Sequence, residues 1–277
     1  MTAALDHPAA PRASAGTAAN WRFVLATDLD GTFLGGSPDM RAGLYDWLKR
    51  HRDDVGLIFV TGRDPDFIRA LCAGEVDHAP NVPVPDYVVA DVGTTVARME
   101  MGSEGPALSF LKDLEGPISS AWGERSAFVR ETLCDAPGLV PQDTPFRHRM
   151  SYHYDPAGYD PAVVRPLEEA GLDILISAGC FLDVLPGGVN KGSTLLALVD
   201  HLGLPRDAVL VAGDTLNDLS MFHTGLHGAV VGGAEAALLD ATRELPRTRH
   251  CRAPGAGGIA EAIAAFGLHP EPPEGSI

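Results

Sequence analysis

A short apolar run that leads directly into two carboxylates is the feature that most constrains how this chain folds. Residues 23–26 read Phe-Val-Leu-Ala, a pattern typical of a parallel strand buried on both faces. Residues 28–32 follow at once and read Asp-Leu-Asp-Gly-Thr. Ligands of open α/β sheets bind where strands end, and two carboxylates there repel each other unless a cation or a proton intervenes. The alternative interpretation is a helix cap with a tight turn, because Asp and Gly are common in such loops.

Two further apolar runs end in polar residues in the same way. Residues 57–60 lead into Thr-Gly-Arg at 61–63, and residues 209–212 lead into Gly-Asp-Thr-Leu-Asn-Asp at 213–218. Just before the last of these strands, Asn-Lys-Gly at 190–192 opens an expected helix. Each polar group therefore stands where a strand ends or a helix begins, which favours a ligand site over four unrelated turns.

In this order, the four polar segments resemble the four motifs of the haloacid dehalogenase (HAD) superfamily of phosphohydrolases. The longer run 213–222 is similar to the fourth motif of the large-cap subclass, which includes sucrose-phosphate phosphatases and related sugar phosphatases. The resemblance covers residues 21–268. It implies an α/β fold in which a doubly wound, mainly parallel sheet forms a Rossmann-like HAD core and carries an inserted α+β cap domain.

The alternation of strands and helices divides the chain at two places. Strand–helix units are interrupted by a segment in which helices stand beside alternating strands, and the units then resume. We therefore expect a HAD core domain at 21–103 and 187–268 and a cap domain at 104–186. Disordered tails are expected at 1–20 and 269–277.

One stretch of the cap segment, residues 147–154, alternates strictly and predicts a strand with two unlike faces. The alternation puts Arg147, Arg149 and His153 on one face, together with Ser151. This row of donors suits sugar hydroxyls if it faces the phosphate site. The alternative is the solvent-facing side of an antiparallel sheet.

Composition excludes several classes of function. The 37 acidic and 21 basic residues give a net charge of −16, which argues against nucleic-acid binding because that needs clustered Lys and Arg. No apolar run is long enough to span a bilayer, and we expect neither a signal peptide nor a membrane partner. The four cysteines show no metal-ligand spacing and suit a cytoplasmic protein with reduced thiols. The ten histidines form no ligand pattern, and the oligomeric state cannot be inferred.

The resemblance assigns roles to the aspartates. Asp28 takes the part of the nucleophile, which suits a carboxylate because this group is ordinarily ionised at pH 7. Asp30 takes the part of the acid and base. The metal ligands are Asp28, the backbone carbonyl of Asp30, and Asp214, with Asp218 bound directly or through water. Such hard oxygen ligands favour Mg²⁺. The alternative for Asp218 is a carboxylate favoured by a helix N-terminus.

The phosphate is expected to contact a second set of residues. Thr61 and the backbone N–H of Gly62 would hold its oxygens, Lys191 would add positive charge, and Asn217 would reach the phosphate or the substrate. A glycine at 62 permits close backbone approach. The alternative for Lys191 is a solvated surface lysine. We expect Arg63 to brace its loop.

These expectations combine into a Mg²⁺-dependent phosphatase that acts on a soluble sugar phosphate through an aspartyl-phosphate intermediate. The similarity to sucrose-phosphate phosphatases extends to the run 183–186, Asp-Val-Leu-Pro, and favours a disaccharide or glycoside phosphate, including pseudo-disaccharide phosphates. Thr215-Leu216 departs from the small residues frequent in motif four. The alternatives are a phosphosugar mutase and a non-catalytic sugar-phosphate sensor.

Overall fold

The computed structural model describes residues 21–103 and 105–274 and contains two β-sheets. The larger sheet is formed by β1 (Phe23–Thr27), β2 (Val55–Val60), β3 (Tyr87–Ala90), β4 (Thr95–Gly102), β5 (Gly105–Phe110), β10 (Val209–Gly213), β11 (His227–Gly232) and β12 (Thr248–Pro254). Its order is β12-β11-β10-β1-β2-β3-β4-β5. All pairs from β12 to β3 are parallel, and β4 and β5 add two antiparallel strands at one edge.

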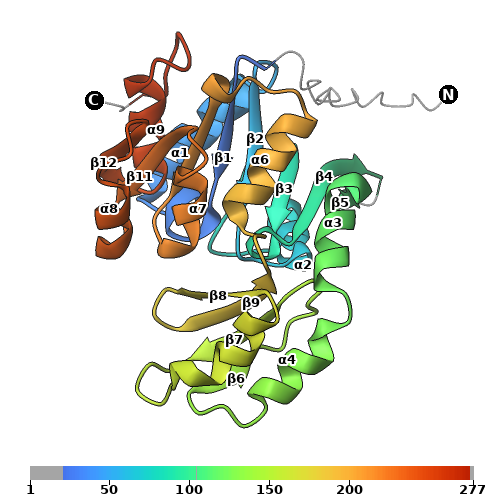
Figure 1. Cartoon of the computed structure of the whole chain (residues 1–277). Coiled ribbons are helices and arrows are strands. Elements are labelled where there is room, and N and C mark those ends of the chain that lie inside the picture. Colours follow the sequence, from blue (N-terminus) through green and yellow to red (C-terminus); the bar gives the residue numbers. More distant parts are fainter. Residues whose placement is uncertain (1–20, 104, 275–277) are drawn as a thin grey trace, which may run out of the picture.

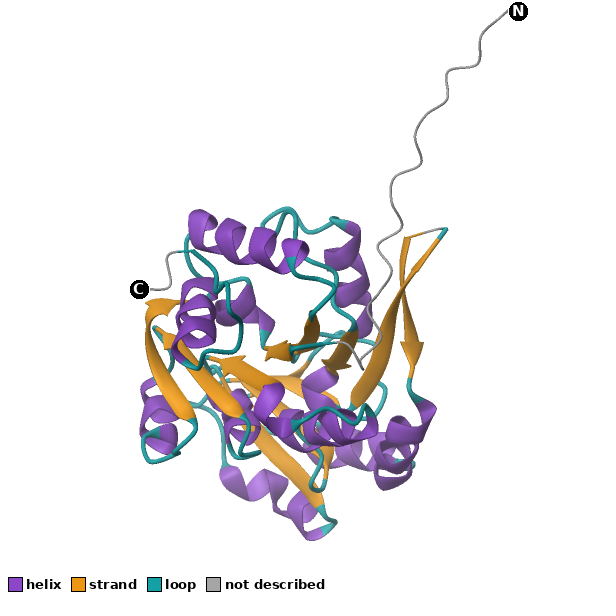
Figure 2. Ribbon diagram, turned by 90° about the horizontal axis from the view of Figure 1, so that it is seen from above, coloured by secondary structure: helices purple, strands orange, loops and turns teal. Residues whose placement is uncertain are grey.

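Helices cover both faces of this sheet, as Figure 2 shows from above. Its helices are α1 (Pro38–Arg50), α2 (Pro65–Ala73), α6 (Lys191–His201), α7 (Leu219–Phe222), α8 (Ala236–Thr242) and α9 (Ala256–Ala265). Alternate residues of β1 enter opposite cores: Leu25 packs with α1, α2 and α9, whereas Val24 packs with α6, α7 and α8. The expected doubly wound, mainly parallel α/β core is confirmed.

The smaller sheet forms a cap, which Figure 1 shows as a separate layer beneath the core sheet. Its strands are β6 (Leu139–Pro141), β7 (Met150–Tyr154), β8 (Leu172–Ser177) and β9 (Phe181–Pro186), and its helices are α3 (Lys112–Trp122), α4 (Arg125–Leu133) and α5 (Arg165–Glu169). The antiparallel order is β6-β7-β9-β8. Ala178 and Gly179, both at positive φ, form the tight turn of the expected hairpin β8–β9.

The junction between core and cap lies later than the sequence pattern suggests. The expected boundary before residue 104 falls in the hairpin β4–β5, because β5 pairs along its length with β4 and so extends the core sheet. Helix α3 then passes from one domain to the other: Ile118 packs in the core and Trp122 packs in the cap.

The expected strand 147–154 is only partly correct. Strand β7 begins at Met150, and Arg147 and Arg149 lie in the loop before it. The expected alternation also fails inside the strand, because Met150, Ser151 and Tyr152 are all buried. The loop residues instead contact the core, which removes them from the pleat of the cap sheet.

The end of the described chain packs against the core, contrary to the expectation of a disordered tail from residue 269. His269 is buried, and the indole N–H of Trp47 donates to the carbonyl of Glu271 at 2.7 Å. The expected tail at 1–20 and residues 275–277 lie outside the described residues. Within the described ranges, no helix combines the length and the apolar character needed to cross a membrane.

Candidate active site

The candidate site lies where three neighbouring parallel strands end. Asp28 follows β1, Thr61 follows β2, and Asp214 follows β10, and because β1 pairs with both other strands, the three ends lie at one edge of the sheet. The turn after Asp28 requires glycine. Gly31 has φ +79°, and a Cβ there would stand 2.2 Å from Oδ2 of Asp214. The chain after β1 is therefore pressed against the chain after β10.

Lys191 lies at the centre of this edge. The first turn of α6 places it there, with Asn190 capping the helix by accepting a hydrogen bond from the backbone N–H of Ser193 at 2.9 Å. Its Nζ donates to Oδ1 of Asp28 at 2.7 Å and to Oδ1 of Asp218 at 2.6 Å. The side chain has no exposed surface, so the alternative of a solvated surface lysine is wrong.

Burial and charge oppose each other in this cluster. Burial raises the pKa of Asp28 well above the ordinary value, although the Lys191 ammonium acts in the opposite direction. Burial also acts to lower the pKa of Lys191, but the carboxylates of Asp218 and Asp28 outweigh it, and the pKa is raised. Lys191 is therefore a fixed positive charge beside the carboxylate of Asp28.

Three carboxylates fit the requirements of a divalent cation that prefers oxygen. Ligand atoms of Asp28, Asp214 and Asp218 lie within 4.8 Å of one another. Asp214 Oδ1 accepts from the hydroxyl of Thr32 at 2.6 Å, and burial raises the pKa of Asp214 to about 6. Among the described residues, none donates a hydrogen bond to Oδ2 of Asp28 or Oδ2 of Asp214. These two oxygens are therefore free to bind a cation.

Asp218 is engaged differently from the other two carboxylates. Its Oδ1 accepts from Lys191, and its Oδ2 accepts from the backbone N–H groups of Asp214 at 2.9 Å and Thr215 at 3.1 Å. It also forms a capping box with Thr215 at the short helical turn Leu216–Asp218. The helix-start role considered for Asp218 is thus observed, and both of its oxygens are occupied.

Asp30 stands at the rim of the same site. Half of its side chain is exposed, and the guanidinium of Arg63 donates to both of its oxygens, at 2.8 and 2.9 Å. The guanidinium also lies over the ring of Phe67, 4.5 Å from its centre. Arg63 therefore braces its loop, as expected, and holds Asp30 as well.

A cavity of about 290 Å³ lies over these residues, between the core and the cap. Its lining residues are Asp28, Asp30, Gly62, Arg63, Val92, Gln142, Arg149, Ser177, Ala178, Phe181, Asp183, Thr215 and Asn217. Of the expected phosphate and substrate residues, Gly62, Arg149 and Asn217 line it. Thr61 is buried, and its hydroxyl accepts from the backbone N–H of Arg63 at 3.1 Å.

The cavity also brings in five cap residues that the sequence pattern did not place at the site. They are Gln142, Ser177, Ala178, Phe181 and Asp183. The last four lie in or beside the β8–β9 turn, whose Ala-Gly pair was the one local signal that the hairpin has a tip. Nothing in the sequence indicated that this tip faces the ends of the core strands.

Arg149 joins the cap to the core. Its guanidinium donates to Asp183 at 2.7 Å, to Ser151, to Asp91 at 3.2 Å and to the carbonyl of Gly62 at 3.0 Å. The residue is only 4% exposed, so these protein groups surround it. It therefore forms part of the cavity wall and also holds the loop that carries Gly62.

The core partner of Arg149 is a strained segment. Asp91 and Val92 have φ values of +53° and +58°, which side chains rarely adopt. Asp91 is fully buried and accepts from the hydroxyl of Thr95 at 2.8 Å as well as from Arg149. Burial raises the pKa of Asp91, with Arg149 acting against it. Val92 of this segment lines the cavity.

The structure does not bring Arg147 and His153 to the cavity. Arg147 donates to both oxygens of Glu115, at 2.7 and 2.9 Å, and lies over the ring of Phe110. His153 is exposed and contacts the ring of Phe181 on the cap surface. Arg147 therefore forms another link between the cap and the core, and the side chain of His153 is turned to solvent.

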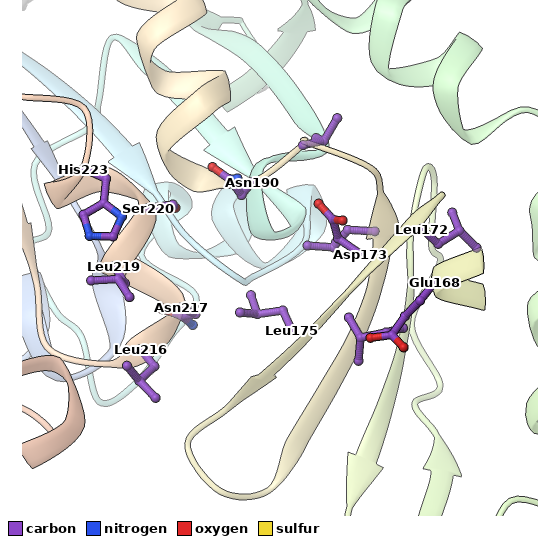
Figure 3. Close-up of a pocket in the computed structure, with 13 residues that line it drawn as sticks. Glu168, Leu172, Asp173, Leu175, Asn190, Leu216, Asn217, Leu219, Ser220 and His223 are labelled. Carbon is purple, nitrogen blue, oxygen red and sulfur yellow. The ribbon is translucent and has the colours of Figure 1, made fainter. Parts of the chain in front are cut away.

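A second cavity, of about 520 Å³, lies between strand β8 and the segment that carries Asn217 (Figure 3). Leu175 of the cap faces Leu216 and Asn217 of the core across it. Asn217 lines both cavities. Asn217 thus stands between the cavity over Asp28 and a larger, partly apolar space beside strand β8.

Comparisons with known proteins all point to the same family. The model of the sucrose-6F-phosphate phosphohydrolase family matches residues 21–267. A glucosylglycerol-phosphate synthase of Pseudomonas anguilliseptica is 40% identical over 89% of this chain, which spans only 31% of that protein. The mannosylfructose-phosphate phosphatase of Agrobacterium fabrum is 28% identical, with 89% of this chain and 98% of the relative covered.

A solved structure agrees with both the fold and the family. The sucrose-phosphatase of Synechocystis sp. PCC6803, determined in complex with sucrose and phosphate, superposes with a TM-score of 0.75 at 27% identity. The match covers 89% of this chain and 98% of that protein. With its motifs gathered at one sheet edge under a cap, this chain belongs to the sucrose-6F-phosphate phosphohydrolase family of HAD phosphatases.

Proposed function

We propose that this protein is a Mg²⁺-dependent phosphatase that hydrolyses the phosphate ester of a disaccharide or another glycoside. The proposal rests on three residues at one cavity. Lys191 holds the carboxylate of Asp28 at the floor of the cavity, and Asp30 lies at its rim. A nucleophile below, a positive charge beside it and a proton donor above are the three groups that a phosphate monoester requires.

The reaction then follows in two displacements on phosphorus. Asp28 attacks, the bond between phosphorus and the sugar oxygen breaks, and Asp30, released from Arg63 and in its protonated form, donates its proton to that oxygen. Asp30 next removes a proton from water, which attacks the aspartyl-phosphate, releases inorganic phosphate and restores Asp28. The ammonium of Lys191, with the backbone N–H of Gly62 and the hydroxyl of Thr61, would offset the charge of the phosphoryl group.

The free oxygens of Asp28 and Asp214 and the backbone carbonyl of Asp30 would hold the Mg²⁺. When bound, this ion supplies positive charge to the phosphoryl oxygens. Asp218 then acts through Lys191 and the loop of Asp214, since its own oxygens are engaged.

The proposed substrate class rests on the cavity and on the relatives. Gln142, Ser177 and Asp183 offer hydrogen-bond partners for hydroxyls from the cap side of the cavity. Three similar proteins are named for phosphorylated glucosylglycerol, mannosylfructose and sucrose, each of which joins a sugar to a second polyol or sugar. The unpaired cysteines support the expected cytoplasmic location, and a small phosphorylated sugar is the proposed partner.

The proposal is tested by a substrate panel scored for phosphate release with Mg²⁺ and with EDTA. The panel holds the phosphates of glucosylglycerol, mannosylfructose and sucrose, with glucose 6-phosphate and p-nitrophenyl phosphate for comparison. We expect at least one glycoside phosphate to be preferred, EDTA to stop turnover, and Asp28→Asn to abolish it. Turnover that persists in the Asp28 variant contradicts the nucleophile. An isomeric sugar phosphate as product identifies a mutase, and binding without phosphate release identifies a sensor.

A second variant tests the acid. Asp30→Asn removes the proton donor and should slow hydrolysis of the glycoside phosphate by about 10²-fold or more. The same variant should affect p-nitrophenyl phosphate less, because nitrophenolate leaves without a proton. Equal slowing of both substrates would assign Asp30 a structural role through Arg63.

A further inference from the structure

A second group of metal-ligating side chains lies at the opposite end of the core sheet. His51 follows helix α1, Asp54 precedes strand β2, and His269 lies in the segment after α9. Strand β2 separates this group from Thr61, and its six residues span about 20 Å at about 3.3 Å per residue. The group is therefore distinct from the phosphatase site.

The ligand atoms lie close enough to share one cation, with the two histidines next to different oxygens of Asp54. Nε2 of His269 is 3.2 Å from Oδ2 of Asp54, and Nδ1 of His51 is 4.0 Å from Oδ1 of Asp54. All three ligand atoms lie within 4.8 Å of one another. A tetrahedral zinc ion with bonds of about 2.0–2.2 Å keeps its ligand atoms about 3.3–3.6 Å apart. Shifts of side chains alone would complete this geometry.

The surroundings hold the two imidazoles in place. The ring of Trp47 packs against both His51 and His269, with ring centres 4.9 and 5.1 Å away. The side chain of His269 is 3% exposed and that of His51 is 17% exposed, while Asp54 at 38% leaves the group open to solvent. A cation can therefore enter at a site whose histidines are largely pre-positioned.

The hydrogen bonds of His269 permit it to act as a ligand. Its Nδ1 is 3.0 Å from the carbonyl of Glu271 and 3.1 Å from the backbone N–H of the same residue. When Nδ1 carries the proton and donates to this carbonyl, the lone pair of Nε2 faces Asp54. The opposite tautomer donates from Nε2 to Asp54, so a bound metal selects one of two available arrangements.

A neighbouring cation does not block the site. Nε of Arg22 is 3.6 Å from Oδ2 of Asp54, and its side chain is more than half exposed. An exposed pair of this kind contributes little to stability, so Arg22 can move away at small cost. Asp54 is thus available to a metal.

We propose that His51, Asp54 and His269 bind a Zn²⁺ ion that joins the chain's C-terminal segment to the loop between α1 and β2. Two imidazoles and one carboxylate favour borderline cations such as Zn²⁺, whereas the carboxylates of Asp28 and Asp214 at the phosphatase site favour Mg²⁺. The two sites therefore differ in the metal they select. The fourth position is open to water.

The test is a Zn²⁺ titration of the full chain in saturating Mg²⁺, by calorimetry and by thermal unfolding. We expect one equivalent of Zn²⁺ to bind, and an excess of about a hundredfold over its Kd to raise the Tm by about 5 °C or more. Both effects should vanish in His51→Gln and in His269→Gln, and both should persist in His201→Gln, a control at an exposed histidine that ends α6.

Three controls separate this site from other sources of Zn²⁺ binding. Each variant is compared with itself without Zn²⁺, so a loss of basal stability does not obscure the result. Asp214→Asn should keep the Zn²⁺ effect, because it alters only the phosphatase site. Cys134→Ser with Cys180→Ser should keep it as well, because these are the exposed thiols. Binding that survives both histidine variants, binding lost in the Asp214 or cysteine variants, or no binding at all overturns the proposal.

Discussion

Lys191 shows what a single buried charge imposes on its neighbours. Its ammonium contacts two buried carboxylates and has no access to water, so replacing it leaves both carboxylates unpaired. We expect Lys191→Met to abolish phosphatase activity and to lower the free energy of unfolding by about 3–5 kcal/mol. Urea unfolding in EDTA, monitored by circular dichroism, measures the second effect.

A double variant separates the two roles of this lysine. Lys191→Met with Asp218→Asn removes one of the two unpaired carboxylates and should recover part of the stability. Activity should stay absent, because the positive charge beside Asp28 is still missing. A Lys191→Met protein that unfolds at the wild-type urea concentration would mean that the ammonium does not compensate these carboxylates.

The loop before β7 acts as one element because its two arginines bind the core. Arg149 holds Asp91 and the carbonyl of Gly62, so its loss should disturb the loop that carries Gly62 as well as the cap. We expect Arg149→Met to lower kcat/KM at least tenfold for both a glycoside phosphate and p-nitrophenyl phosphate. Sequence alternation alone predicts a residue that reads sugar hydroxyls, for which only the glycoside phosphate would respond. Steady-state kinetics with the two substrates distinguishes these outcomes.

Stability provides the control for this variant. Arg149→Met leaves the buried carboxylates of Asp91 and Asp183 without their positively charged partner. Arg149→Met with Asp91→Asn leaves only one carboxylate unpaired and should therefore unfold at a higher temperature. If the two variants unfold together, Asp91 and Arg149 are not coupled.

The elements differ in how far the sequence determined them. The strands before Asp28, Thr61 and Asp214 were predictable, because a fully buried parallel strand is a continuous apolar run and its carboxyl end is where ligands bind. The loop containing Arg147 and Arg149 was not, because its partners Glu115 and Asp91 are distant in sequence and nothing local marks them. The alternating pattern there predicted a strand. In the structure, Arg147 and Arg149 instead lie in a loop that contacts the core.

The same limit applies to the sites. The phosphatase motifs could be predicted because each is a short run of residues in which reactive side chains directly follow a strand or begin a helix. The cap side of the cavity depends on how the β8–β9 hairpin is placed against the core, which periodicity does not encode. His51 and His269 looked unrelated among ten histidines because only the packing of the C-terminal segment on Trp47 brings them together.

At the scale of the whole molecule, the cysteines report on cooperative unfolding. Burial raises the pKa of Cys72 and of Cys251 to about 12, so about one thiol in 10⁴ is ionised at pH 8. Cys134 and Cys180 are exposed, and a hydrogen bond to Asp135 raises the pKa of Cys134. We expect iodoacetamide to modify Cys180 first and Cys134 more slowly, and the partly buried Cys72 and the buried Cys251 only on unfolding.

Peptide mass spectrometry over a time course measures these rates, and the same experiment in urea should show four similar rates. Modification of Cys72 or Cys251 in the native protein as fast as that of Cys180 would show that the core opens locally instead of unfolding as a unit.

The position of β1 in the middle of its sheet has a consequence for synthesis on the ribosome. Val24 pairs with Gly56 on one side and with Val209 on the other, and the entire cap is encoded between these two partners. A nascent chain therefore exposes one edge of its central strand until β10 has emerged, by which time the cap has long been available to fold. The half-sheet of β1, β2 and β3 must be kept from pairing with other chains during that interval. The time needed to translate the cap codons thus sets how long Asp28 remains without its neighbours Lys191 and Asp214.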